Sequence, residues 1–555
     1  MSDPARPWPA GVPDRLDAPL HNVAENLRLS AERVPEAVAL IYHGAEITYA
    51  GLQERVLRLA GWLQEQAGVR RGDRVVLYMQ NSPQFIIAFY AILRANAVVV
   101  PVNPMNRLRE IEHVVTDSGA RVAIVGQELL DYIAPLIGTS LVDVLATAYA
   151  DMADPACDIP LPPGLQEGER EDFPAGITGW RAMEAAGLTP GPVTTGGNDL
   201  AAIPYTSGTT GRQKGCMHSH TTLQTTLVGS VVWNPLGEGG ATLSVLPLFH
   251  VTGMQNSMNG PLYAGETIVL MSRWDRRVAV ELIRRYRIAR WRSISTMIVD
   301  LVSDPGVRAE DLASLQTLGG GGAAMPAAIA QRLKGLTGLD YLEGYGMTET
   351  MAGVIINPHD APRPQCLGIP VFDVDARIID PDTDRELGPE EPGEIIVSAP
   401  QVFHGYWNNE EATRAAFLER DGKRFLRTGD IARYDRDGYF YIVDRVKRMV
   451  NASGFKVWPT EVEALMHAHP GIVEACIVGY PDPRRGESVL AYVVAKDELP
   501  EAELIAWCRE QMAAYKVPRR VVYVEALPRS GSGKVQWLEL QERAARDFGQ
   551  LSAAE

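Results

Sequence analysis

Cysteine is scarce in this sequence of 555 residues, and the cysteines that are present lie far apart. None of the five forms a C-x-x-C pair; they are Cys157, Cys216, Cys366, Cys476 and Cys508. This spacing argues against a disulfide framework and against a zinc site built from paired thiols. It is typical of reduced thiols, so we expect a cytoplasmic protein.

Basic residues and long apolar runs are also in short supply. The 53 lysines and arginines face 69 aspartates and glutamates, which gives a formal net charge of −16. An acidic chain binds nucleic acid poorly, so no nucleic-acid partner is expected. The most apolar segment, residues 85–102, is interrupted by Arg94 and Asn96, and no integral membrane segment is predicted. The first 20 residues contain no apolar stretch typical of a signal peptide.

Hydrophobic residues nevertheless make up 46% of the chain. A chain of this length can bury a large core and is expected to fold as more than one domain. In the N-terminal part, short apolar runs alternate with segments of helical periodicity, which predicts strand–helix–strand units and a parallel sheet. The predicted strands are residues 38–42, 74–79, 98–102 and 121–125, and the predicted helices are 49–66, 83–93 and 107–117.

The composition changes three times further along the chain. Residues 151–197 are dense in proline, glycine and acidic residues, and we expect a long surface connection there. Alternating, turn-rich sequence over residues 367–406 predicts a β-rich subdomain. After residues 444–448 the pattern indicates a compact α+β unit of about 100 residues. Thr460 and Glu463 have the spacing of a capping box, which predicts the start of a helix.

The most informative stretch runs from Tyr205 to Gly215 and reads Y-T-S-G-T-T-G-R-Q-K-G. Its glycines let backbone N–H groups point into a concavity, its hydroxyls add donors, and Lys214 adds a point charge. This combination suits the phosphates of a nucleotide, although the spacing is not that of a Walker A loop. A flexible linker is the alternative, and the ordered run of hydroxyls, glycines and lysine disfavours it.

Further motifs follow in the same chain. L-P-L-F-H-V-T-G begins at Leu246, and four consecutive glycines begin at Gly319, where the absence of side chains allows a flat ligand to approach the backbone. The others are Y-G-M-T-E-T at 345–350, R-T-G-D at 427–430, D-R-V-K-R at 444–448 and P-R-S-G-S-G-K at 528–534.

Together, these motifs resemble those of the adenylate-forming superfamily of acyl-CoA and aryl-CoA synthetases, firefly-type luciferases and adenylation domains. The resemblance covers about residues 22–540 and is strongest to fatty-acid or aryl and carbocyclic acid CoA ligases. It implies an α/β multidomain fold, in which a large N-terminal domain of two layered αβ subdomains and a β-rich subdomain precedes a small mobile α+β domain. The implied domains are residues 1–443 and 449–555, joined by a hinge at 444–448.

The resemblance implies an acid–thiol ligase of the AMP-forming acyl-CoA synthetase type. The substrate carboxylate attacks the α-phosphorus of ATP, pyrophosphate leaves, and CoA then takes the acyl group from the adenylate. Because the substrate is already an anion, the first step needs charge neutralisation and alignment and no general base. ATP, Mg²⁺ and CoA are the expected cofactors.

The resemblance also assigns a nucleotide site. Glu349 and Thr206 are expected to hold Mg²⁺ with hard oxygen ligands. Tyr345 is expected to stack on adenine, while Asp430 and Arg445 bind the ribose. Gln213 stands where the family usually has proline. The pyrophosphate contacts are Thr206, Ser207, Gly208, Thr209, Thr210, Gly211 and Lys214; the adenine wall is Gly320, Gly321, Gly322 and Ala323; and the remaining contacts are Glu343, Gly344, Gly346, Met347 and Thr348.

The C-terminal domain is expected to alternate between two poses. In the first, Lys534 bridges the substrate carboxylate and the α-phosphate, where a cation stabilises the developing charge. Lys447 occupies the hinge position. After rotation, Gly454 and Phe455 would line the CoA tunnel. With Lys534, the expected catalytic residues are Thr206, Glu349 and His250; His250 is expected to order the carboxylate at the junction of acyl pocket and tunnel, and a purely structural histidine is the alternative.

The acyl pocket is expected to be apolar and adaptable, because methionine is frequent in its predicted lining. Amino-acid-activating relatives place an aspartate just after the L-P-L-F segment, and residues 250–253 contain no acid. A monocarboxylic acid is therefore expected: a medium- or long-chain fatty acid, as in fatty acid metabolism, or a carbocyclic or aryl acid. Ordinary core packing is the alternative for each lining residue. The predicted lining is Trp233, His250, Val251, Met254, Met258, Met297, Gly322 and Met351.

Two other functions stay open at this stage. An acyl-AMP ligase could load the thiol of a separate carrier protein, since no carrier domain is fused to the chain. A non-catalytic nucleotide-binding protein is the other alternative, which the joint presence of Thr206, Glu349, Asp430 and Lys534 disfavours. The sequence also leaves a homodimer open.

Overall fold

The computed structural model describes residues 7–206, 213–236, 239–322, 325–445, 448–452, 455–482, 486–529 and 535–548. The chain divides into two compact units. The first comprises Met1–Asp375, Val397–Leu426 and Asp437–Tyr439, and the second comprises Ala376–Ile396, Arg427–Arg436 and Phe440–Glu555. The second unit therefore takes in parts of the predicted β-rich subdomain as well as the C-terminal segment.

The first unit contains a seven-stranded sheet that is buried on both faces. On β3, Val75 and Leu77 pack into one apolar cluster, and Val76 and Tyr78 pack into another on the opposite face. Burial on both faces explains why these strands read as nearly continuous apolar runs. All neighbours in the sheet are parallel except β11 and β8. In sheet order the strands are β11 (His218–Ser219), β8 (Leu200–Ala202), β4 (Val98–Val102), β3 (Arg74–Tyr78), β5 (Val122–Gly126), β6 (Asp143–Thr147) and β7 (Ile177–Gly179).

A nine-stranded sheet forms the second sheet of this unit. Its middle strands are parallel, and the chain reverses at both ends of the sheet. In sheet order the strands are β18 (Ile369–Pro370), β17 (Ala352–Ile356), β16 (Tyr341–Met347), β15 (Thr317–Gly321), β14 (Arg290–Ser293), β12 (Ala241–Ser244), β13 (Thr267–Leu270), β1 (Val38–Tyr42) and β2 (Ala45–Thr48).

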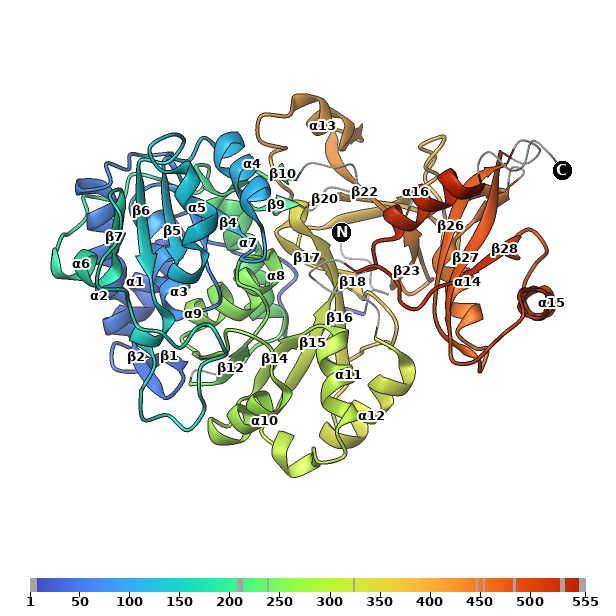
Figure 1. The fold of residues 1–555 in the computed structure, drawn as a ribbon, viewed down its shortest axis with the longest axis horizontal. Helices are drawn as coiled ribbons and strands as arrows, with labels where there is room; N and C mark the ends of the chain where they lie inside the picture. The colour runs from blue at the N-terminus through green and yellow to red at the C-terminus, as the bar shows by residue number, and fades with distance from the viewer. Residues whose placement is uncertain are drawn as a thin grey trace. The chain divides into compact units, whose positions relative to one another are not determined.

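Helices form three layers around these two sheets, so the unit has the predicted layered αβ architecture. Figure 1 shows one outer layer beside β14, β15 and β16. The central layer is α1 (Ala24–Arg33), α2 (Tyr49–Glu65), α3 (Pro83–Arg94), α7 (His220–Trp233), α8 (Val251–Met254) and α9 (Gly260–Ala264). The outer layers are α4 (Leu108–Ser118) with α5 (Leu130–Ile133), and α10 (Arg276–Arg285) with α11 (Ser295–Ser303) and α12 (Ala327–Thr337).

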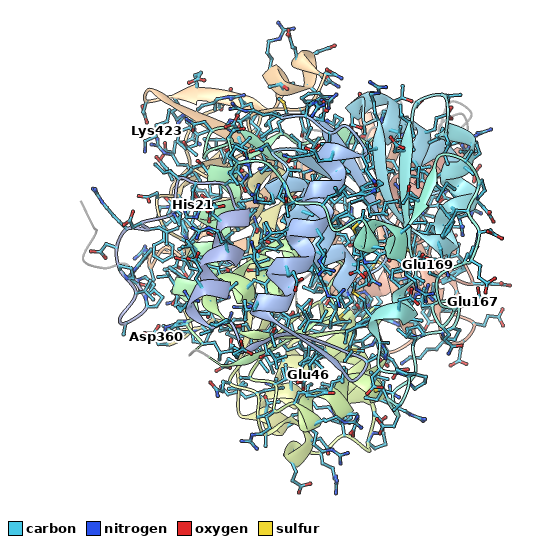
Figure 2. All side chains as sticks on the ribbon, turned by 90° about the vertical axis from the view of Figure 1, so that its left-hand side faces the viewer. His21, Glu46, Glu167, Glu169, Asp360 and Lys423 are labelled. Carbon is cyan, nitrogen blue, oxygen red and sulfur yellow. The ribbon has the colours of Figure 1, made fainter. Side chains whose placement is uncertain are left out.

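The expectation that residues 151–197 form only a surface connection is wrong in one part. Residues 177–179 form β7, which pairs with β6, and Trp180–Ala185 forms the short helix α6. Trp180 and Met183 anchor this segment in the core. Glu169, which Figure 2 labels beside Glu167, accepts a hydrogen bond from the Arg181 backbone at 3.0 Å. An edge strand of three residues in a polar stretch is too short to show an alternating pattern.

The second unit contains a five-stranded C-terminal sheet with helices on both faces. Helices α14 (Pro459–Met466) and α15 (Glu501–Gln511) cover one face, and α16 (Trp537–Phe548) covers the other. The strands are β24 (Val450–Ala452), β25 (Phe455–Val457), β26 (Ile472–Asp482), β27 (Gly486–Ala495) and β28 (Arg520–Tyr523).

A separate group of strands carries the R-T-G-D and D-R-V-K-R motifs. Strand β22 (Lys423–Tyr434) runs from the first unit into the second, where it pairs with β23 (Phe440–Arg445). The neighbouring elements are β19 (Asp375–Ile379), β20 (Gly393–Ser398), β21 (Phe417–Arg420) and α13 (Glu410–Ala415).

The predicted capping box at Thr460 is wrong, although a helix does begin there. Pro459 occupies the first helical position, and Trp458 precedes it without a side-chain cap. Proline suits that position because its missing N–H would have no partner in the helix. The acceptor for the Thr460 N–H is Asp444 Oδ2 at 2.6 Å, which comes from the segment predicted as the hinge.

Candidate active site

The glycine-rich motif forms a short hairpin in the first unit. Strand β9 (Tyr205–Thr206) pairs with β10 (Lys214–Gly215), so that Thr206 stands opposite Lys214. His113 donates from Nε2 to the backbone carbonyl of Gln213 at 2.9 Å, which holds the hairpin where the family usually has proline. The remaining predicted phosphate contacts, Ser207, Gly208, Thr209, Thr210 and Gly211, lie outside the described residues.

A chain of contacts joins this hairpin to Glu349. The Lys214 ammonium lies 4.2 Å from the centroid of the Tyr406 ring. The Tyr406 hydroxyl donates to Glu349 Oε1 at 2.8 Å. The Glu349 side chain is only 7% exposed, and burial together with this carboxylate raises the pKa of Tyr406 far above its usual range. The structure thus brings Thr206, Lys214 and Glu349 into one neighbourhood.

The backbone around Glu349 is held from two sides. Phe403 donates its N–H to the Glu349 carbonyl at 2.8 Å, and His218 donates from Nε2 to the Thr348 carbonyl at 2.8 Å. Burial lowers the pKa of His218 to about 3, so this histidine is neutral at physiological pH. Met351 and Ala352 follow with φ of 49° and 92°, a strained left-handed conformation. Such strain persists only where the surrounding contacts over-determine it, and it is frequent at functional sites.

The glycine run at 319–322 is required by the protein's own packing. A Cβ on Gly320 would lie 1.8 Å from the Ser293 carbonyl oxygen, and a Cβ on Gly321 would lie 2.4 Å from the Gly344 carbonyl oxygen. Gly322 has φ of 88°, which a side chain would strain, and its Cβ direction is open. The close approach of neighbouring strands therefore accounts for the first glycines, whereas their expected role as an adenine wall stays a prediction. Ala323 lies outside the described residues.

Replacing Gly320 tests this packing argument. We expect Gly320→Ala to lower the free energy of unfolding by about 2 kcal/mol or more, because strand backbone must move to accept the methyl group. Gly335→Ala is the matched control: Gly335 lies within α12 with no atom near its Cβ direction. That change should stabilise the protein by about 0.5–1 kcal/mol. Equal effects in urea unfolding would contradict the packing explanation.

Glu343 is a buried carboxyl beside the same glycine run. It stands opposite Gly320 in the pairing of β15 and β16, and its side chain is 5% exposed. Burial raises the pKa of Glu343 to about 7, although the backbone N–H groups of Met325 and Gln365 donate to its two oxygens at 3.3 and 3.0 Å. The predicted nucleotide contact is therefore close to half protonated at neutral pH.

This raised pKa predicts a pH-dependent stability difference. The folded state holds the Glu343 proton more tightly than the unfolded state, so stability from this group is lost as pH rises from about 4.5 to about 7. Glu343→Gln removes this dependence. We compare the unfolding free energies of the variant and the unaltered protein at each pH. From pH 5 to pH 8, this difference should shift by about 2 kcal/mol in favour of the variant. Glu310→Gln, at a surface side chain, should show no such gain.

The expected ribose contacts lie in the second unit. Asp430 on β22 stands opposite Arg445 on β23, which fits a shared role. The Asp430 side chain is 5% exposed, and its backbone N–H donates to Thr428 Oγ1 at 3.1 Å. The side chains of Arg445 and Phe455 are not described, and Lys447, Gly454 and Lys534 lie outside the described residues. Their assigned roles stay predictions.

Half of the eight predicted acyl-pocket residues pack in the central layer of the first unit. Val251, Met254, Met258 and Met351 are buried together in one apolar cluster. His250 is exposed and begins α8, where its Nδ1 accepts a hydrogen bond from the Thr252 backbone at 3.3 Å.

Two other predicted lining residues have different surroundings. Trp233 is enclosed by Trp8 and Phe372 and donates from Nε1 to the Asn357 carbonyl at 3.0 Å. Met297 packs into the cluster of α10, α11 and α12 on the other face of the nine-stranded sheet. The structure therefore brings four of the lining residues together and separates Met297 from them.

Two residues near Glu349 escape prediction from the sequence. Tyr406 donates a hydrogen bond to the Glu349 carboxylate, and the Lys214 ammonium lies over its ring. His218 donates a hydrogen bond to the Thr348 carbonyl. Tyr406 follows a glycine in a stretch without a recognisable motif. His218 lies just after the glycine-rich motif, and its complete burial becomes visible only in the structure.

The chain belongs to the family of AMP-binding enzymes. The family pattern matches residues 27–407, and the pattern of the AMP-binding enzyme C-terminal domain matches residues 461–534. Within this family the chain is an AMP-forming acid–thiol ligase, an ATP-dependent acyl-CoA ligase that acts through an acyl-adenylate.

Its relatives are similar over almost their whole length. A feruloyl-CoA synthase from Amycolatopsis sp is 36% identical over 517 residues, which cover 92% of this chain and 97% of the relative. A long-chain-fatty-acid–CoA ligase from Salmonella typhimurium is 34% identical over 557 residues, 97% of each chain. The crystal structure of ATP-bound MatB from Rhodopseudomonas palustris matches with a TM-score of 0.83 and 29% identity, covering 96% of this chain and 99% of that one.

Proposed function

We propose that this acyl-CoA ligase activates a monocarboxylic acid, either a medium- or long-chain fatty acid or a carbocyclic or aryl acid. The observation that carries the proposal is the apolar cluster of Val251, Met254, Met258 and Met351, in which Met351 comes two residues after Glu349. The absence of an acid in residues 250–253 disfavours an amino-acid substrate. The two curated relatives named for feruloyl and long-chain fatty acyl substrates are consistent with either class.

In the first step, an oxygen of the substrate carboxylate bonds to the α-phosphorus of ATP and pyrophosphate leaves. The hairpin of Thr206 and Lys214 holds the leaving phosphates, and Lys534 offsets the repulsion between the two anions. Asp430 and Arg445 position the ribose. In the second step, the CoA thiol loses its proton, its sulfur bonds to the acyl carbon, and AMP leaves; Gly454 keeps the path to that carbon open, and Lys447 serves as the hinge between the steps.

Magnesium fits this site as part of the incoming nucleotide. Glu349 supplies a carboxylate and Thr206 a hydroxyl, which are the hard oxygen donors that Mg²⁺ prefers, and ATP supplies the remaining charge. Among the described residues, no group of three His, Cys, Asp or Glu side chains could hold a metal ion by itself. Glu349 and Thr206 therefore suit a metal ion whose other ligands include phosphate oxygens of the bound ATP. Bound there, Mg²⁺ would neutralise the phosphate charge.

A panel of acids, assayed with and without CoA, tests the proposal. Pyrophosphate release that depends on a fatty or aryl acid, with thioester formation on addition of CoA, is the expected result. Pyrophosphate release with no CoA thioester would favour loading of a carrier-protein thiol. Amino-acid-dependent turnover, or no pyrophosphate with any acid, would overturn the proposal.

The part of the chain that the structure describes contains no helix long and apolar enough to cross a membrane. None of the five cysteines takes part in a disulfide in the structure.

A further inference from the structure

One face of the nine-stranded sheet changes character from strand to strand. On β13, Ile268 and Leu270 belong to the apolar cluster of the central layer. On the neighbouring β12, Thr242 stands beside Ile268 and Ser244 beside Leu270, so these two polar side chains share that face. Both are fully buried. The face of the sheet that packs against the central helical layer is therefore apolar at β13 but polar at β12. It is also polar at the next strand, β14.

Strand β14 contributes two arginines to this face. Arg290 stands beside Thr242 in the sheet register, and Arg292 comes two residues later on the same side. Arg290 has partners for its two terminal nitrogens: one lies 3.1 Å from Glu266, and the other donates to the Asn234 carbonyl at 2.7 Å. Thr242 donates to the second oxygen of Glu266 at 2.7 Å. The Glu266 carboxylate is thus already bound by Arg290 and Thr242.

Arg292 has no such partner. Its side chain is 9% exposed, yet it makes no hydrogen bond, ion pair or ring contact with any described residue. Burial and repulsion from Arg290 lower its pKa to about 10, so the guanidinium keeps its charge at neutral pH. No Arg292 nitrogen is among the fully buried atoms that lack a partner, so the guanidinium is accessible to solvent. A mostly buried charge with no protein partner is unfavourable, and proteins keep one where something else completes it.

The guanidinium points at the glycine run. Arg292 stands beside Gly319 in the sheet, and a Cβ on Gly319 would lie 2.6 Å from one of its terminal nitrogens. Gly319 directly precedes Gly320, the first residue of the expected adenine wall. Since Thr242 pairs with Arg290, the same register brings Ser244 beside Arg292 on the other side. Among the described residues, the Ser244 hydroxyl also has no hydrogen-bond partner.

The helical side of this region carries further unpartnered oxygens. Strand β12 packs against the π-helical turn Gln255–Asn259, which directly follows α8 and contains the predicted pocket residue Met258. Ser257 Oγ and Asn259 Oδ1 in this turn are buried and have no hydrogen-bond partner among the described residues. The charged Arg292 guanidinium and several polar atoms without partners among the described residues therefore lie where the sheet meets the expected acyl pocket.

We propose that Arg292 is a specificity-determining residue, which binds a second oxygen-bearing group at the end of the acid remote from the reacting carboxyl. This inference rests on the proposed function and narrows it: the substrate is an acid with a distal carboxylate or hydroxyl rather than a plain alkyl or aryl acid. A guanidinium presents paired donors that match a carboxylate and also bind a hydroxyl oxygen. Ser244 is placed to add one further hydrogen bond.

Pairs of acids that differ only in the distal oxygen test this inference. Para-hydroxycinnamic acid is compared with cinnamic acid, and hexanedioic acid with hexanoic acid, by acid-dependent pyrophosphate release. The oxygenated member should have the higher kcat/KM in at least one pair. Arg292→Met should lower that preference by about 10- to 100-fold, because the plain acid no longer faces an unmatched charge while the oxygenated one loses its partner. Arg292→Lys, which keeps the charge but loses the paired donors, should retain only part of the preference.

Stability separates this role from a structural one. Removing an unpaired buried charge should raise the Tm of ligand-free Arg292→Met, whereas loss of a structural contact would lower it. Arg290→Lys, on the same strand, is the matched control and should leave the preference unchanged. The inference is overturned if plain acids are preferred throughout, or if Arg292→Met lowers both members of a pair equally. No pyrophosphate with any acid would instead overturn the proposed function, and the inference with it.

Discussion

Glu349→Gln should lower acid-dependent pyrophosphate release by about 100- to 1,000-fold, the loss expected when one preorganised electrostatic contact is removed from a reaction centre. The change keeps the shape of the side chain and the acceptor for the Tyr406 hydroxyl, which donates to Glu349 Oε1 at 2.8 Å. What disappears is the negative charge, and with it the carboxylate ligand proposed for magnesium. The variant should also require a higher Mg²⁺ concentration for half-maximal rate.

Tyr406→Phe is the matched control for this prediction. It leaves the Glu349 carboxylate in place and removes only the hydroxyl that orients it. The expected loss is about 3- to 10-fold, in line with one ordinary hydrogen bond. A Glu349→Gln enzyme with more than about a tenth of normal activity, or with an unchanged Mg²⁺ requirement, would remove Glu349 from the proposed metal site.

The sequence predicted the buried elements of the fold well, because burial and local signals agree there. Strands β1 and β4 have the predicted bounds, since short apolar runs with polar ends leave little freedom. Helix α3 begins where predicted because Pro83 fits its first turn and Ser82 caps it by accepting the Phe85 N–H at 3.1 Å. The failures, β7 and the cap of α14, depend on a partner distant in the chain.

The same division holds for the candidate site. Thr206 and Lys214 lie in one motif, and their juxtaposition follows from a local hairpin. Tyr406 reaches Glu349 across 57 residues, and no local pattern encodes that hydrogen bond. Arg292 is a further example: it is one of two arginines in the short strand β14, and its difference from Arg290 becomes visible only when the neighbours on β12 and β15 are known.

Lys534→Ala should separate the two half-reactions. Acyl-adenylate formation should fall by about 100- to 1,000-fold, because the cation proposed to bridge the carboxylate and the α-phosphate is lost. Thioester formation from supplied acyl-adenylate and CoA should change by less than about threefold, since that charge is no longer needed once pyrophosphate has left. Single-turnover measurements of each step give the two values. Lys496→Ala, at an exposed lysine of the same unit, is the control and should affect neither step.

Gly454→Leu completes the test because it should produce the opposite pattern. A leucine side chain in a narrow thiol path would slow thioester formation while leaving adenylate formation nearly intact. Opposite effects of the two variants require that different surfaces of the C-terminal segment serve the two steps. The proposed hinge at Lys447 is what would exchange these surfaces. If Lys534→Ala lowers both steps by the same factor, one fixed arrangement serves both reactions, and the alternation of the C-terminal domain has to be abandoned.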